Sequence, residues 1–167
     1  MKVKIAFFFF LFFISSFSFG LNISKEEIRL VYIQAASDES ACKKLLRYCD
    51  ENKMSDKYLQ SGYSACARMM MAKHLFNPLS KLSYFQEGKQ LLEKAIENAP
   101  ENIELRFLRF STQCHAPHFL NYHGKLVEDK IFLLKTLHFH QDKQLKKLIV
   151  QVLLESNLLT PSEKSKI

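Results

Sequence analysis

Glycine and proline are both scarce in this chain of 167 residues, which contains four of each. The prolines Pro78, Pro100, Pro117 and Pro161 lie between segments of helical periodicity, where proline marks the boundaries of helices. No segment has the strict alternation of apolar and polar residues that predicts a half-buried β-strand. These absences exclude a fold built on a β-sheet and favour an all-α protein with a single domain.

The longest apolar run is short and lies at the N-terminus. Residues 1–20 read MKVKIAFFFFLFFISSFSFG, with two lysines first, an apolar run from 5 to 19, and a small residue, Gly20, at the end. This order predicts a secretory signal peptide that is cleaved between Gly20 and Leu21. The run is shorter than the roughly 20 residues of a membrane span, and an uncleaved anchor is the alternative. No cysteine follows it that would carry a lipid.

The net charge and the predicted export together indicate which kinds of molecule the protein could bind. The formal net charge is +7, and two of the lysines that contribute to it belong to the predicted signal peptide. Such a charge gives a weak attraction to an anionic membrane surface, while export argues against nucleic acid as the partner. We therefore expect a periplasmic protein with a helical domain over residues 21–156 and a frayed tail over 157–167.

Apolar residues recur at helical spacing through the rest of the chain. Ser24 to Glu27 has the pattern S-x-x-E of a capping box, which predicts the start of a helix. The fourth predicted helix has the clearest division into an apolar and a charged face. The seven predicted helices cover about 24–37, 38–52, 56–76, 80–98, 102–114, 127–139 and 142–156.

The segment FQEGKQLLEKAIENAPENIEL, Phe85 to Leu105, resembles the second helix of a tetratricopeptide repeat that runs into the first helix of the next repeat. Gly88, Ala95 and Pro100 occupy the two small-residue positions and the proline position of that pattern. No second copy is visible at the spacing of about 34 residues that such repeats have. The resemblance thus implies one tetratricopeptide-like hairpin in an array of antiparallel helix pairs.

Two stretches also resemble a group of small exported helical proteins of flavobacteria that have no assigned activity. They are NPLSKLSYFQEGKQLLEKAIENAPENIELRFLRFSTQ and APHFLNYHGKLVEDKIFLL. This resemblance implies a bacterial, periplasmic, helical protein, and it implies no catalytic residues.

The stretch QCHAPHFLNYHG, residues 113–124, is rich in possible metal ligands. Only His118 and His123 have a spacing that is common in zinc sites, and Pro117 favours an extended backbone before it, which prevents a helical pair of histidines. We therefore expect no metal and no cofactor. A small metal- or haem-handling protein is the alternative function, although the C-x-x-C-H motif of covalent haem attachment is absent. Its ligands would be Cys114, His115, His118 and His123.

The same stretch is expected to form a surface loop between helices. Phe119, Leu120 and Tyr122 are its large apolar residues, and we expect them to pack inward.

Four cysteines in an exported protein allow three complete disulfide pairings. Cys42 and Cys49 lie roughly 10 Å apart if they share a helix, which exceeds the limit of about 7 Å for a disulfide, so each can pair only with Cys66 or Cys114. Free thiols buried on apolar faces are the other option. No cysteine has the partners of a catalytic nucleophile at a recognisable spacing. We expect no enzyme, and a hydrolase with an unidentified site is a further alternative.

Arg106, Arg109 and Gln113 form the polar stripe of the predicted helix 102–114, at the spacing i, i+3, i+7. The tetratricopeptide resemblance implies that this helix lines a concave surface, where the guanidinium groups would bind a carboxylate of a protein or peptide partner. We therefore expect a non-enzymatic interaction or accessory protein. The alternatives for the stripe are internal ion pairing, with candidate partners Glu104, Glu128 and Asp129, and a face that is simply solvated.

The residue order at the N-terminus predicts where the mature protein starts. N-terminal sequencing of the exported form should begin at Leu21, because signal peptidase cleaves after a small residue such as Gly20. Met1 retained in a membrane fraction would show instead that the segment is an anchor.

Overall fold

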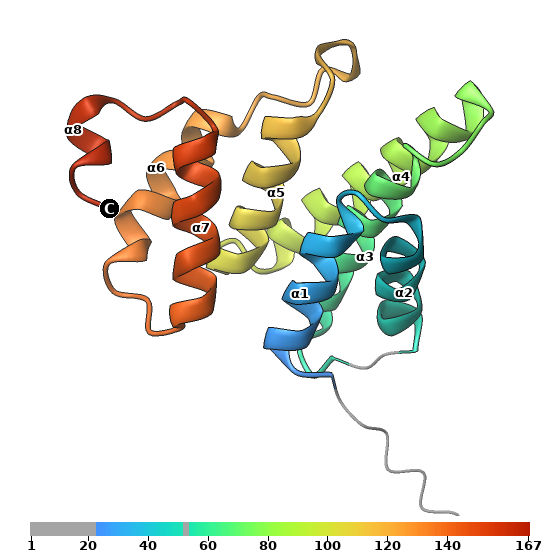
Figure 1. Ribbon diagram of the computed structural model, residues 1–167, viewed down its shortest axis with the longest axis horizontal. Helices are drawn as coiled ribbons and strands as arrows, with labels where there is room; N and C mark the ends of the chain where they lie inside the picture. The colour runs from blue at the N-terminus through green and yellow to red at the C-terminus, as the bar shows by residue number, and fades with distance from the viewer. Residues whose placement is uncertain (1–22, 52–53) are drawn as a thin grey trace, which may run out of the picture.

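The computed structural model describes residues 23–51 and 54–167, and the regular structure in these ranges is entirely helical (Figure 1). This confirms the all-α fold. The predicted signal peptide and its cleavage site, Gly20 and Leu21, lie outside the described residues. Among the described helices, none is both long enough and apolar enough to cross a bilayer. The elements are α1 (Lys25–Ala35), α2 (Glu39–Asp50), α3 (Lys57–Met71), α4 (Pro78–Asn98), α5 (Ile103–His115), the 3₁₀ turn η1 (His118–Leu120), α6 (Leu126–Leu137), α7 (Lys143–Glu155) and α8 (Pro161–Lys164).

Capping side chains explain where most helices begin. Ser24, from the predicted capping box, accepts a hydrogen bond from the amide of Glu27 at 3.1 Å. Asn77 caps α4, and Pro78 takes the first helical position, where an amide hydrogen has no partner in the helix. α4 therefore begins at Pro78 rather than at residue 80. The other capping residues are Asp38, Asp56, Asn102, Asp142 and Thr160.

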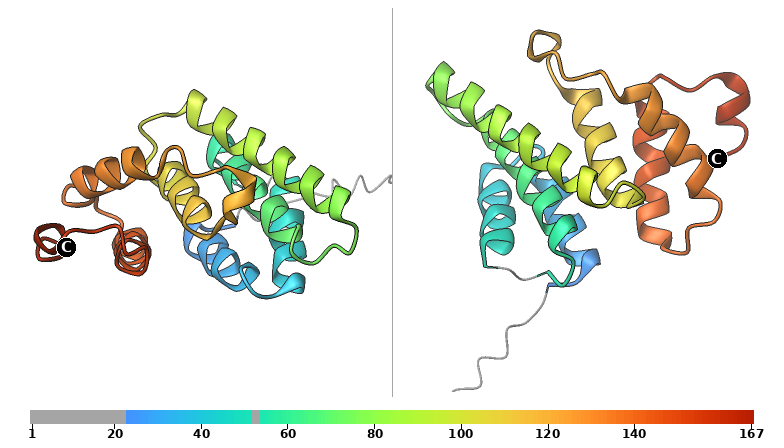
Figure 2. Two further views of the ribbon diagram at one scale, coloured as in Figure 1. Left: turned by 90° about the horizontal axis from the view of Figure 1, so that it is seen from above. Right: turned by 180° about the vertical axis from the view of Figure 1, so that it is seen from behind.

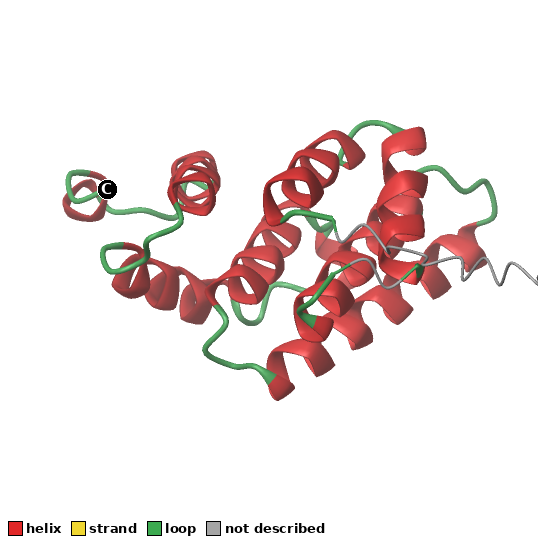
Figure 3. Ribbon diagram, turned by 90° about the horizontal axis from the view of Figure 1, so that it is seen from below, coloured by secondary structure: helices red, strands yellow, loops and turns green. Residues whose placement is uncertain are grey.

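Successive helices run in alternate directions and pack side by side (Figures 1 and 2). α1 to α4 form one end of the molecule, α6 to α8 form the other, and α5 lies between them. Seen from below, the molecule is elongated, and loops join the helices (Figure 3). Ten of the 13 residues of α5 are buried, which makes α5 the central helix.

α3 and α4 approach closely at Gly88. A Cβ atom at Gly88 would lie 2.6 Å from the carbonyl oxygen of Ala65 and 2.6 Å from the Cγ atom of Met69. The carbonyl oxygen belongs to the backbone of α3, so it moves only if the helix moves. Glycine at this position therefore sets the distance between the two helices.

The C-terminal segment differs from the frayed tail that was predicted for 157–167. The hydroxyl of Thr160 accepts a hydrogen bond from the amide of Glu163, and the Glu163 carboxylate accepts one from the amide of Thr160. Lys130 of α6 pairs with Glu163 at 2.9 Å, and Leu159 is buried. A complete capping box and contacts with α6 thus stabilise a helix that is too short to form alone.

Gly88→Ala should lower the free energy of unfolding by about 1–3 kcal/mol, because the added methyl group overpacks the contact between α3 and α4. The loss is expected even though alanine favours a helix over glycine by roughly 0.5–1 kcal/mol. Chemical denaturation followed by circular dichroism measures the change.

The matched control is Gly124→Ala, because nothing beyond the neighbours of Gly124 lies within 4 Å of the added Cβ atom. Equal unfolding midpoints for the two variants would contradict the close approach at Gly88.

Candidate functional site

α5 carries the predicted polar stripe into the interior of the protein. Arg109 is 4% exposed, Arg106 9% and Gln113 1%. Asp129 of α6, which is fully buried, accepts hydrogen bonds from Nε of both arginines. Arg109 also binds Glu93 of α4 through Nη1, at 2.7 Å.

These contacts correct the prediction of a binding surface at Arg106, Arg109 and Gln113. Arg106 donates a second hydrogen bond to Glu128 at 2.9 Å, so both guanidinium groups are engaged by carboxylates of the chain itself. Internal pairing with Glu128 and Asp129 was an alternative for this stripe, and the structure confirms it. The cluster joins α4, α5 and α6, and its role is structural.

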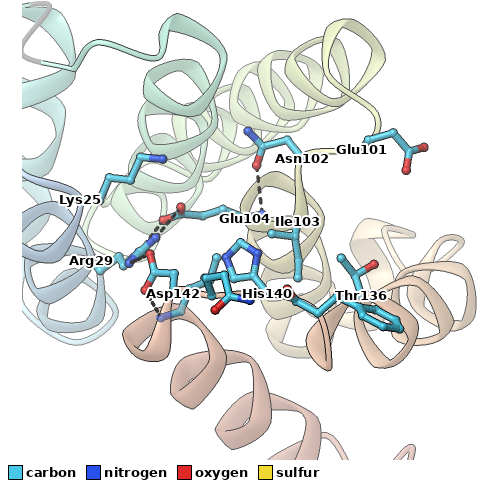
Figure 4. A pocket seen from close by; sticks show the side chains of 12 residues that line it. Lys25, Arg29, Glu101, Asn102, Ile103, Glu104, Thr136, His140 and Asp142 are labelled. Atoms are coloured by element: carbon cyan, nitrogen blue, oxygen red, sulfur yellow. Dashed lines mark hydrogen bonds and ion pairs between the residues drawn. The ribbon is translucent and has the colours of Figure 1, made fainter.

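A second buried cluster surrounds Arg29, which sequence reasoning missed (Figure 4). Arg29 of α1 is 1% exposed and binds both carboxylate oxygens of Glu104, at 2.7 and 2.8 Å. Its Nη1 atom pairs with Asp142, the capping residue of α7, at 2.7 Å, and the hydroxyl of Tyr63 donates to Glu104. The signal in the sequence was a lone arginine beside Ile28, on the apolar face of the first helix.

The Arg29 cluster depends on pH through Asp142. Partial burial would raise the pKa of Asp142, but hydrogen bonds from the Leu145 amide and from Arg29 outweigh burial, so its pKa is lowered. A carboxyl group with a lowered pKa stabilises the fold above its unfolded-state pKa. This stabilisation is therefore present at neutral pH and is lost as the pH falls through the lowered pKa of Asp142.

A polar cavity of about 570 Å³ adjoins this cluster, between α1, the start of α5 and the α6–α7 turn. Figure 4 shows Arg29, Glu104 and Asp142 directed toward one another, while Glu101 points away from them. Because Arg29, Glu104 and Asp142 pair with one another, we infer that these side chains stabilise the fold and do not bind a ligand.

The four candidate metal ligands have other contacts. His115 Nδ1 lies 2.8 Å from the carbonyl oxygen of Ser111, and His123 Nε2 lies 3.0 Å from that of Ala116. His118 stacks on His123, with ring centroids 4.8 Å apart, and Cys114 lies half-buried at the end of α5. Within residues 23–51 and 54–167, no three of the histidine, cysteine and acidic side chains are grouped so that they could hold a metal ion.

The four cysteines are free thiols, so none of the pairings that the sequence left open is formed. Burial raises the pKa of Cys49 and of Cys66 to about 12, and that of Cys42 and of Cys114 to about 11. A reactive cysteine needs a lowered pKa and a cationic neighbourhood. These thiols are protonated at neutral pH and act as small apolar side chains.

The candidate functional site is a groove of about 920 Å³ that is lined by residues of α1, α3, α4, α5 and α7, and we call it the apolar groove. Its volume is near the upper end of the range of about 300–1,000 Å³ for ligand pockets. Helices that are far apart in the sequence contribute to it, so no local motif could have indicated it. The apolar lining includes Tyr32 and Ile33 of α1, Ala36 just after it, Met69 and Met70 of α3, Leu82 and Phe85 of α4, Phe107 of α5, and Leu148 and Val152 of α7.

The polar side chains deep in the apolar groove already have partners in the chain. The hydroxyl of Tyr32 donates to Ser111 at 3.2 Å, and that of Thr112 donates to the carbonyl oxygen of Leu108 at 2.8 Å. The groove therefore presents mostly apolar surface. Charged side chains among its lining are Lys73 and Lys81, from the α3–α4 side, and Glu155, at the end of α7.

No protein-family model, curated protein or solved structure shows significant similarity to this chain.

Asp129→Ala should lower the free energy of unfolding by about 3–5 kcal/mol, because it leaves the buried guanidinium groups of Arg106 and Arg109 without their shared partner. Thermal or chemical denaturation of the purified variant measures this loss.

Glu39→Ala serves as the control, since it removes a carboxylate from an exposed pair with Lys43, and exposed pairs contribute little. Its melting temperature should equal that of the wild type. If Asp129→Ala also melted like the wild type, apolar packing alone would hold α5 and α6 together.

Proposed function

We propose that this protein is a non-enzymatic interaction protein, and that it holds an apolar helical segment of a protein partner in the apolar groove. One observation carries the proposal: the groove is lined mostly by apolar side chains, and the hydroxyl groups of Tyr32, Ser111 and Thr112 in it are hydrogen-bonded within the chain. Ile33 and Leu82, on separate helices of the lining, are each 46% exposed. A partner that covered them would gain hydrophobic stabilisation.

Backbone hydrogen bonding favours a helix as the occupant. An extended segment needs hydrogen-bond partners for its amides and carbonyls, and burial without them is costly. The described part of the chain has no β-sheet edge that would supply such partners. A helix pairs its own backbone groups, and amphipathic helices commonly bind in apolar grooves.

The side chains of the apolar groove suit an amphipathic helix. Met69 and Met70 are flexible, polarisable residues that adapt to different apolar surfaces. Lys73 and Lys81 face the groove from the α3–α4 side. A partner helix with acidic residues on the flank beside these lysines would match this charge.

The proposal includes export to the periplasm, which rests on the order of basic, apolar and small residues in 1–20. The tetratricopeptide-like pattern of Phe85 to Leu105 supports an interaction role by resemblance. This segment corresponds to the second half of α4, the connecting turn and the start of α5, and α4 and α5 both contribute to the apolar groove.

Leu82→Glu should weaken binding of an amphipathic helical peptide at least about tenfold, equivalent to roughly 1.4 kcal/mol. The charge would be buried against the apolar face of the peptide, and it would repel the acidic flank. The probe is a fluorescent peptide of about 14 residues, with leucines at i, i+3, i+4 and i+7 and glutamates beside them. An isolated helix of this length is only marginally stable in water. Fluorescence anisotropy measures the affinity.

Ile131→Glu is the matched control, because Ile131 is 56% exposed on α6 and does not line the apolar groove. A peptide of the same composition in scrambled order controls for charge and hydrophobicity. Equal binding of the ordered and scrambled peptides, or equal losses in both variants, would rule out a helix-binding groove.

A further inference from the structure

Two loops at the upper ends of the helices, as drawn in Figure 1, expose large apolar side chains. Phe76 and Leu79, at the α3–α4 connection, are 100% and 78% exposed, and Phe119 of η1 is 84% exposed. Phe119 was predicted to pack inward, and its exposure shows that this prediction was wrong. Figure 1 shows both loops at the top of the molecule. Pro78, at the start of α4 directly after the first loop, and Pro117, directly before η1, line the same groove, so the two loops flank one opening.

These two loops lie within the segments that lack acidic residues. No aspartate or glutamate occurs in residues 57–86 or in residues 105–127. Lys73 and Lys81 flank the first loop, and neither takes part in an ion pair with a described residue. Glu155 lines the apolar groove from α7, so one carboxylate stands near two lysines. Glu39 of α2 lies near His74 but pairs with Lys43. The two loops themselves are therefore apolar and free of acidic residues, with Lys73 and Lys81 beside the first of them.

We propose that this end is a docking surface for an anionic lipid bilayer. Phe76, Leu79 and Phe119 enter the boundary between headgroups and acyl chains, and the flanking lysines lie near the anionic headgroups. Apolar side chains combined with lysines give proteins affinity for such membranes. The apolar side chains project from separate loops, and a fluid bilayer receives separate projections without the matched shape that a folded protein surface must provide.

The docking surface goes beyond the proposed function and can be tested apart from it. Phe119, Lys73 and Lys81 line the apolar groove as well, so the two surfaces share them. Phe76 and Leu79 lie outside the lining of the groove, whereas Leu82 belongs to it. Substitution at Phe76 therefore tests the contact with the bilayer, and substitution at Leu82 tests the contact with the peptide.

The chain contains no tryptophan, so Phe76→Trp adds a single fluorescent reporter at the docking surface. The exported protein is mixed with vesicles of phosphatidylcholine and phosphatidylglycerol that carry brominated acyl chains. We expect the emission to shift to shorter wavelength and to be quenched by the bromine atoms, because the indole ring enters the bilayer.

Phe139→Trp is the matched control, since Phe139 is 80% exposed in the α6–α7 turn, which lies at the lower ends of the helices in Figure 1. Its emission should stay unchanged. An unshifted spectrum for Phe76→Trp, or equal quenching of both variants, would overturn the proposal. So would a shift of the Phe76→Trp emission that is caused by the amphipathic peptide and not by vesicles, because a protein would then cover this end.

The charge of the docking surface is tested separately. Replacing Lys73 and Lys81 together by glutamine should weaken binding to the anionic vesicles about thirtyfold, at roughly 1 kcal/mol for each lysine near the surface. The control is the replacement of Lys143 and Lys147 on α7 by glutamine, which removes the same charge elsewhere. Equal losses in the two double variants would show that only the net charge acts, and would contradict a localised surface.

Discussion

Ion pairs buried along α5 hold the helices of this protein together. Glu104 at the start of α5 receives Arg29 of α1, which also binds the capping residue of α7, Asp142. Arg109 binds α4 and α6 at the same time. Each guanidinium group has carboxylate partners, because an unpaired charge at such depth would be too costly. α5 can therefore be buried at the centre of the protein only because neighbouring helices supply side chains of opposite charge to its own.

The apolar groove follows from where these ion pairs lie. Arg29 of α1 meets Asp142 and Gln144 at the start of α7, so the two helices are joined at one end. Farther along, Ile33 of α1 and Val152 of α7 both line the groove, so space opens between the helices there. Apolar contact closes most gaps in a protein interior. Here the ionic contact at one end fixes the two helices, while the apolar groove lies between them farther along.

Local rules predicted the helices, and long-range contacts decided the site. The caps Ser24 and Asn102 act within three residues of themselves, so the sequence indicates them directly. The stripe of Arg106 and Arg109 was also visible, but whether a guanidinium group faces solvent or Asp129 depends on how α6 packs on α5. Arg29 was missed for the same reason: its partner Glu104 is 75 residues away.

The sequence by itself determined an all-α fold and the approximate start and end of α1 to α7, because these depend on hydrogen bonds and periodicity over a few residues. Only the tertiary structure decided that the arginines of α5 are internal and that the exposed apolar surface lies at the groove and at Phe76 and Phe119. The physical reason is that a side chain is buried only when a second surface packs against it. A helix face is covered or open according to which distant helix packs on it, and residues of α1, α3, α4, α5 and α7 must come together before the groove exists.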